Sequence, residues 1–269
     1  MIRKGTMIKT LLRRIGTTLK TEFEKRAKMI KAPQSPEEVI PEFTSDYQQI
    51  FGQDLISIVL YGSGARGDYI PRRSDLNFLI VLTEEGIKEL SRAFRVVAKW
   101  HRRRVTTPLF MTNEYIATSL DTFPLEFMNI KQHYRVLWGK DPLAETEIRR
   151  EQLRLQCERE IKGKLLQLRG AYLASRGWGR NLVALASHSL TAFLSIFQGI
   201  LYLLDKEIPH QKGEVIQAMA AETGLDAVPF ARLWEVKEGK VKLPAKKIKG
   251  LMKSYLQEVS RLASWIDKV

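Results

Sequence analysis

The sequence predicts an α/β domain of the α+β kind, with a small mixed sheet, followed by an all-α helical bundle. Two almost continuously apolar runs, at 55–61 and 76–82, have the length and β-branched composition of buried strands. Beyond about residue 144 the apolar residues follow only helical periodicity, in segments too long for strands. We therefore expect a basic N-terminal helical segment at 1–35, the α/β domain at 36–143 and the bundle at 144–269.

The elements expected in the α/β domain alternate between helices and strands. Glycines at 62, 64 and 67 break the chain between the two apolar strands. The segment 84–103 places Ile87, Leu90, Phe94 and Val97 on one face, as in an amphipathic helix. The other expected elements are helices at 37–51 and 126–132 and strands at 105–112 and 134–138.

Four long helices are expected in the bundle, at 145–173, 181–204, 212–222 and 245–266. Glycine or proline separates them. The stretch 182–204 is uncharged and long enough to cross a bilayer. Semi-polar residues nevertheless recur along it at helical spacing, which is typical of a central helix in a bundle and predicts no membrane span. They are Ser187, Thr191, Ser195, Gln198 and Tyr202.

The net charge of +14 is unevenly distributed. Residues 1–35 contain ten Lys/Arg and two Glu, and residues 144–269 contain twenty-one Lys/Arg and fourteen Asp/Glu. Such basic flanks attract nucleic acid, nucleotides or anionic membranes, and they equally form an ordinary solvated surface. The single cysteine, Cys157, excludes an internal disulfide and is typical of a reducing, cytoplasmic location.

The turn after the first strand has the composition of a phosphate-binding site. Gly62 and Ser63 end the strand and begin a helical turn, where backbone N–H groups and a hydroxyl can bind phosphate oxygens. Gly62 and Gly64 let the backbone approach a ligand closely. Twelve residues after Ser63, Asp75 leads into the second strand, where positions 75 and 77 share one face. Two carboxylates there would hold Mg²⁺ against a triphosphate.

The segment GSGARGDYIPRRSDLNFLIVL resembles the signature of the nucleotidyltransferase superfamily, the proteins with polymerase-beta-like folds. The later segment YRVLWGKDPL is similar to the end of that domain in aminoglycoside nucleotidyltransferases. The resemblance implies Mg²⁺-dependent transfer of a nucleoside monophosphate from a nucleoside triphosphate to a hydroxyl, with release of pyrophosphate. It also implies the site residues. They are Gly62, Ser63, Gly64, Arg66 and Ser74 for the nucleotide phosphates, and Asp75 and Asn77 for the metal and catalysis.

Two departures from this pattern argue against the nucleotidyl transfer that the resemblance implies. The second metal position is Asn77, whose neutral oxygen is a poorer Mg²⁺ ligand than a carboxylate. The third strand, where a further carboxylate is usual, contains no acid within 104–111, and Glu114, Asp121 and Glu126 are the nearest substitutes. Three functions are compatible with the sequence: an unusual transferase, a catalytically lapsed nucleotide-binding or regulatory protein, and a basic nucleic-acid-binding protein.

Overall fold

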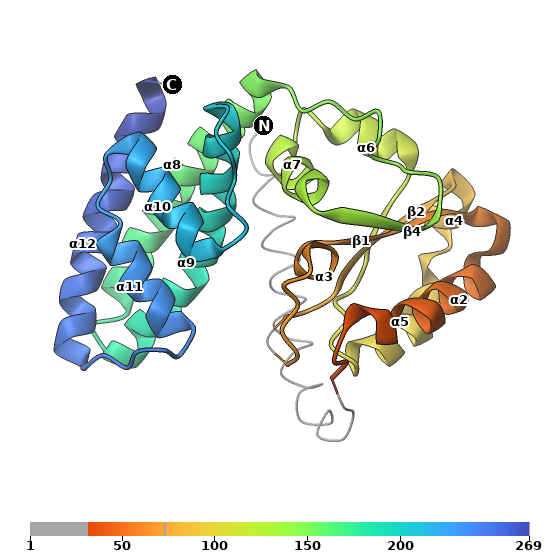
Figure 1. The fold of residues 1–269 in the computed structure, drawn as a ribbon, viewed down its shortest axis with the longest axis horizontal. Helices are drawn as coiled ribbons and strands as arrows, with labels where there is room; N and C mark the ends of the chain where they lie inside the picture. Colours follow the sequence, from red (N-terminus) through yellow and green to blue (C-terminus); the bar gives the residue numbers. More distant parts are fainter. Residues whose placement is uncertain (1–31, 73, 269) are drawn as a thin grey trace. The chain divides into compact units, whose positions relative to one another are not determined.

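A computed structural model describes residues 32–72 and 74–268. The helical segment expected at 1–35 therefore lies almost entirely outside the described residues. The chain forms two compact units (Figure 1). The first contains 32–116 and His133–Ala144, and the second contains Ala117–Gln132 and 145–268.

The first unit is built on a four-stranded mixed sheet with the order β3-β2-β1-β4. Strands β2 (Asn77–Leu82) and β4 (Tyr134–Gly139) flank β1 (Leu55–Tyr61) and are both antiparallel to it. The short strand β3 (Leu109–Met111) pairs in parallel with β2. The predicted fold class, a small mixed sheet with helices followed by a helical region, is confirmed.

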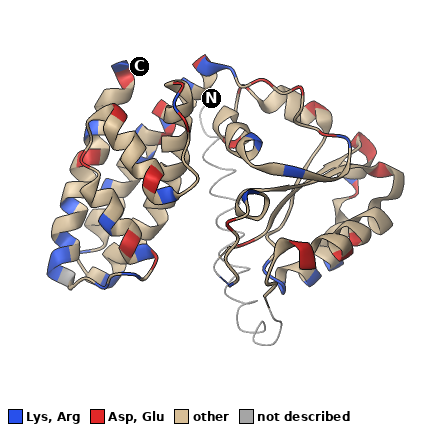
Figure 2. Ribbon diagram, in the orientation of Figure 1, with Lys and Arg blue, Asp and Glu red and all other residues tan. Residues whose placement is uncertain are grey.

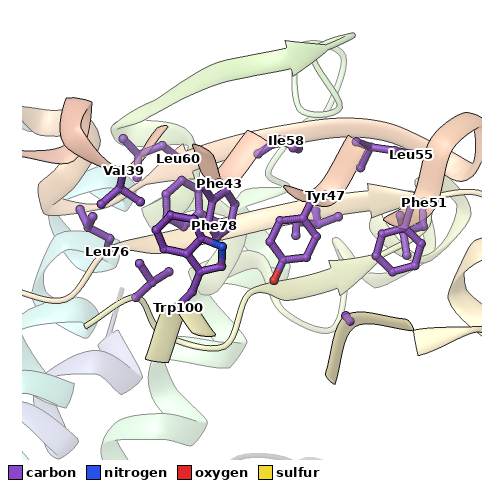
Figure 3. Close-up of a cluster of buried hydrophobic side chains, with 14 residues drawn as sticks. Val39, Phe43, Tyr47, Phe51, Leu55, Ile58, Leu60, Leu76, Phe78 and Trp100 are labelled. Atoms are coloured by element: carbon purple, nitrogen blue, oxygen red, sulfur yellow. The ribbon is translucent and has the colours of Figure 1, made fainter. Parts of the chain in front are cut away.

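One face of the sheet carries an aromatic core beneath helices α2 (Ile40–Phe51) and α5 (Phe94–His101) (Figure 3). Phe43 stacks on Phe78 of β2, with ring centroids 3.8 Å apart, and Trp100 meets Phe43 edge-on. The opposite face of β1 and β2 is buried too, which explains why both strands are apolar at nearly every position. These contacts fix the ends of β1 and β2, where the candidate site lies.

Several elements of this unit differ from the sequence prediction. The single helix expected at 84–103 is divided into α4 (Glu84–Lys88), a 3₁₀ turn at Leu90–Ala93 and α5, because Glu89 leaves the helical conformation. The strand expected at 105–112 shrinks to β3, since Pro108 has no N–H for a ladder. The helical turn expected after Gly62 and Ser63 is α3 (Ser63–Arg66), and the short helix α6 (Asn113–Ser119) was not predicted.

The second unit is a bundle around α9 (Gly179–Leu203), which contacts α7, α8, α10, α11 and α12. By length and composition α9 could cross a membrane, and much of it is buried against these helices. The remaining helices are α7 (Pro124–Gln132), α8 (Arg150–Ala174), α10 (Lys212–Thr223), α11 (Val228–Lys237), which was not predicted, and α12 (Ala245–Trp265).

Helix α7 belongs to the bundle, although the sequence assigned 126–132 to the α/β range 36–143. Two hydrogen bonds hold it there. The Leu125 N–H donates to Gln156 Oε1 on α8 at 2.7 Å, and Asn129 Nδ2 donates to Ser195 Oγ on α9 at 2.7 Å. The chain therefore enters the second unit, returns to the first to add β4, and leaves again.

Replacing Tyr47 by phenylalanine is expected to raise the free energy of unfolding by ~1 kcal/mol. Tyr47 is fully buried among aromatic rings, and its hydroxyl has no hydrogen-bond partner among the described residues. Burial raises the pKa of this phenol, so the group stays neutral. Tyr255→Phe is the matched control, because that equally buried hydroxyl donates to Ser189 Oγ at 3.1 Å. Urea unfolding should show opposite signs, and a loss of stability in Tyr47→Phe would contradict the account.

Candidate functional site

The turn between β1 and β2 is closed by backbone hydrogen bonds around Gly62. The Gly62 N–H donates to the His133 carbonyl, and its own carbonyl accepts from Ala65 and Arg66 N–H, each at 3.0 Å. Gly62 has a φ of 73° and Gly67 a φ of 91°, conformations that side chains disfavour. The two glycines bracket α3, so the chain folds here into a single short helical turn directly after β1.

Gly64, predicted to allow close approach to a phosphate, has a packing role in the structure. It is the buried residue of α3, where a Cβ would lie 2.9 Å from Leu76 Cδ2 and 3.2 Å from Leu60 Cδ1. Both leucines are fully buried. The absence of a side chain at Gly64 therefore seats α3 on the ends of β1 and β2.

We expect Gly64→Ala to lower the free energy of unfolding by ~1–3 kcal/mol, because the added methyl overpacks a buried contact. Gly163→Ala on α8 is the control, since no heavy atom lies within 4 Å of its Cβ position. Because the added methyl group meets no other atom, Gly163→Ala should raise the free energy of unfolding by ~0.5–1 kcal/mol through helix propensity. Equal effects of the two substitutions in chemical denaturation would disprove the packing role.

Arg66 presents a buried cation next to this turn. Its side chain is only 11% exposed, and Nη2 pairs with Asp68 Oδ2 at 2.6 Å. Its Nε is buried and makes no hydrogen bond to the described residues. A buried donor without a partner is costly, and an anion that accepts from it would remove the cost.

Ser74 closes the loop that leads to Asp75. The Ile70 N–H donates to Ser74 Oγ at 3.0 Å, and the Ser74 N–H donates back to the Ile70 carbonyl at 2.8 Å. The hydroxyl oxygen predicted to meet phosphate thus already accepts a loop hydrogen bond. Its O–H proton remains able to donate to a ligand.

Asp75 lies two residues before β2 and is close to a cation. Arg104 Nε is 3.8 Å from Asp75 Oδ1, and both side chains are 44% exposed. The pKa of the neighbouring Tyr69 is raised, chiefly by burial. The positive charge of Arg104 lowers this pKa, and the negative charge of Asp75 raises it. Asp75 is thus paired with arginine at the position where the resemblance places a metal ligand.

Asn77, the first residue of β2, has its side-chain amide oxygen engaged in a hydrogen bond. Thr106 Oγ donates toward Asn77 Oδ1 at 3.1 Å and toward the Leu76 carbonyl at 3.0 Å. On the other side, a Cβ at Gly62 would lie 3.5 Å from Asn77 Nδ2. The amide oxygen, the atom that a metal would need, is therefore engaged by a hydroxyl.

These residues do not fit a magnesium site. Mg²⁺ prefers carboxylates in octahedral geometry, and this site offers one carboxylate, Asp75, beside an engaged amide and the neutral Thr106. Of the substitutes, Glu126 accepts from Gln156 within the bundle, and Asp121 accepts from Thr122. Within residues 32–72 and 74–268, no group of three or more His, Cys, Asp or Glu could hold a metal ion.

No protein-family model matches this chain, and no curated protein matches it in sequence. Among solved structures, the chain is similar to a spectinomycin adenyltransferase from Enterococcus faecialis, crystallised with ATP and spectinomycin. The similarity covers 81% of this chain and 98% of that chain, with 12% sequence identity and a TM-score of 0.49.

Proposed function

We propose that this chain is a nucleotidyltransferase-fold protein that binds a nucleoside triphosphate and has lost the transfer reaction. The observation that carries the proposal is the Thr106–Asn77 hydrogen bond. It engages the side-chain oxygen at the second metal position, while the preceding turn keeps the superfamily pattern. The Gly62 turn and Asp75 keep the spacing of the superfamily signature. In this proposal the site retains phosphate binding and has lost the transfer reaction.

The residues proposed to hold the phosphates surround the Gly62 turn. Ser63 offers its hydroxyl and backbone N–H at the start of α3. Arg66 offers its buried, unpaired Nε, and charge-assisted contacts to phosphate are stronger than neutral ones. The Ser74 hydroxyl offers a further donor. These groups bind a phosphate chain without any requirement for turnover.

The transfer step needs more than binding. A substrate hydroxyl must attack the α-phosphorus while the bond to pyrophosphate breaks, and negative charge on the leaving oxygens must be neutralised. Carboxylate-held metal ions supply that neutralisation, and a third carboxylate can accept the hydroxyl proton. Residues 104–111, beside Asn77, contain no acid. We therefore propose a nucleotide-binding, regulatory role.

Equilibrium dialysis of labelled ATP, with pyrophosphate release measured in the same samples, tests this proposal. We expect saturable binding without pyrophosphate above the protein-free blank. Arg66→Gln should weaken binding about tenfold or more, the loss of one charge-assisted contact. Arg95→Gln, an exposed arginine on α5, removes the same charge and should leave affinity unchanged. Pyrophosphate release that Asp75→Ala abolishes would show a working transferase and refute the lapsed reaction.

A second candidate function is favoured by the charge at one end of the bundle. Figure 2 shows Lys and Arg gathered where α12 begins. Nucleic acid binding at this end would weaken steeply with salt and survive Asp75→Ala. Fluorescence anisotropy with an RNA oligonucleotide at two salt concentrations separates this function from nucleotide binding. The exposed lysines are Lys240, Lys242, Lys246, Lys247, Lys249 and Lys253.

A further inference from the structure

The guanidinium of Arg104 lies beside Asp75, the residue that the superfamily pattern assigns to a divalent ion. We infer that the Arg104 guanidinium supplies the positive charge for the polyphosphate, so that the site binds nucleoside triphosphates without a divalent cation. In this arrangement Asp75 is a positioning residue for Arg104 and not a metal ligand. The inference rests on the proposed function and assigns its binding mode.

The backbone of Arg104 is held in a conformation that arginine disfavours. Its φ is 61°, in the left-handed region, which costs on the order of 1 kcal/mol or more for such a residue. Two hydrogen bonds fix it there: the Arg104 N–H donates to His101 O at 3.2 Å, and the Leu76 N–H donates to Arg104 O at 3.3 Å. Leu76 and Val105 also form a parallel bridge. The backbone of Arg104 is therefore fixed beside the start of β2, next to Asp75.

The guanidinium has donors to spare for a phosphate. Arginine carries five N–H donors in a planar fork, and the 3.8 Å between Arg104 Nε and Asp75 Oδ1 is longer than a hydrogen bond. Among the described residues, Asp75 is the carboxylate within ion-pair distance of Arg104. A phosphate chain can thus accept hydrogen bonds from the Arg104 guanidinium while Asp75 orients that guanidinium.

The surrounding charge favours an anion without metal. Asn77 replaces a carboxylate of the superfamily pattern, and its partner Thr106 is neutral too. The segment 62–77 together with Arg104 holds four arginines against two aspartates. A site with three carboxylates would repel a triphosphate until metal ions neutralised it. This site has no such repulsion to overcome.

Calorimetric titration of ATP and of inorganic tripolyphosphate into the full chain, in excess EDTA and in Mg²⁺, tests the inference. We expect affinities in the two buffers that agree within about threefold, less than one contact to a charged group. Arg104→Gln and Arg104→Gly should each weaken binding about tenfold or more. Glycine adopts the φ of Arg104 without strain, so an unchanged melting temperature in Arg104→Gly excludes misfolding.

Asp75→Asn gives the sharpest contrast between the two binding modes. With Arg104 as the cation, Asp75 orients the guanidinium and holds no metal, so removing its charge should change ATP affinity by the same factor in EDTA and in Mg²⁺. Arg102→Gln is the charge-matched control for Arg104→Gln on the same loop, because Arg102 is exposed, and it should change affinity less than about twofold.

ATP binding that needs Mg²⁺ and disappears in Asp75→Asn would overturn the inference while the proposed function stands. Absence of ATP binding in both buffers would overturn the inference and the proposed nucleotide binding together.

Discussion

Gly139→Ala is expected to lower the free energy of unfolding by more than ~3 kcal/mol, the largest loss for any single methyl group added to the first unit. Gly139 ends β4 with a φ of 78° and pairs with Ser57 of β1. A Cβ there would lie 2.0 Å from the Ile56 carbonyl oxygen and 3.0 Å from Ser57 Cα. Because these are backbone atoms of the central strand, neither can move without breaking the β1–β4 ladder.

Gly224→Ala separates the steric clash from the backbone strain. Gly224 ends α10 with a φ of 68°, close to that of Gly139, and no heavy atom lies within 4 Å of its Cβ position. Its replacement should cost only ~1 kcal/mol, from the left-handed conformation. Urea unfolding followed by circular dichroism measures both. Similar losses for the two variants would show that the clash at Gly139 is relieved and that our account of the edge strand is wrong.

The second large effect is a gain of function. The double substitution Asn77→Asp and Thr106→Asp is expected to create a divalent-cation site at these strand ends, which do not fit one in the native protein. Thr106 Oγ lies 3.1 Å from Asn77 Oδ1, so carboxylates at these two positions would adjoin each other and share the strand ends with Asp75. Three adjacent carboxylates repel one another until a cation binds, and oxygen ligands of this kind suit Mg²⁺ and Mn²⁺.

Calorimetry with Mn²⁺ should therefore detect saturable binding, with a dissociation constant on the order of millimolar or tighter, in the double variant and not in the native protein. The cation should also raise the melting temperature of the variant by mass action. The control carries the same added charge one residue away, as Asn77→Asp with Thr107→Asp. Thr107 contacts His101 and not Asn77, so this control should gain little. Equal gains in both double variants would contradict the geometry of the site.

The strands and the glycine turn between them could be predicted from the sequence because their signals are local. β1 is one apolar run, and Gly62 and Ser63 end it in a recognisable turn. Asp75 follows at a fixed offset along the chain. Each of these features depends on neighbours in sequence, and the sheet places them as expected.

The partners of Asp75 and Asn77 could not be predicted because each lies 29 residues further along the chain. The run 104–111 was informative in sequence only through its lack of acids, and nothing local indicates that Arg104 and Thr106 meet β2. The packing role of Gly64 likewise depends on two leucines from different strands. Helix α7 joins the bundle through polar side chains on α8 and α9, contacts that apolar periodicity does not reveal.

Phosphorus NMR of ATP mixed with the native protein tests the central claim most directly, because one spectrum reports binding and turnover together. The account predicts that the β- and γ-phosphate resonances shift or broaden in the presence of EDTA, and that no pyrophosphate resonance accumulates when Mg²⁺ is added. An unperturbed ATP spectrum, or steady growth of pyrophosphate with Mg²⁺, would contradict it.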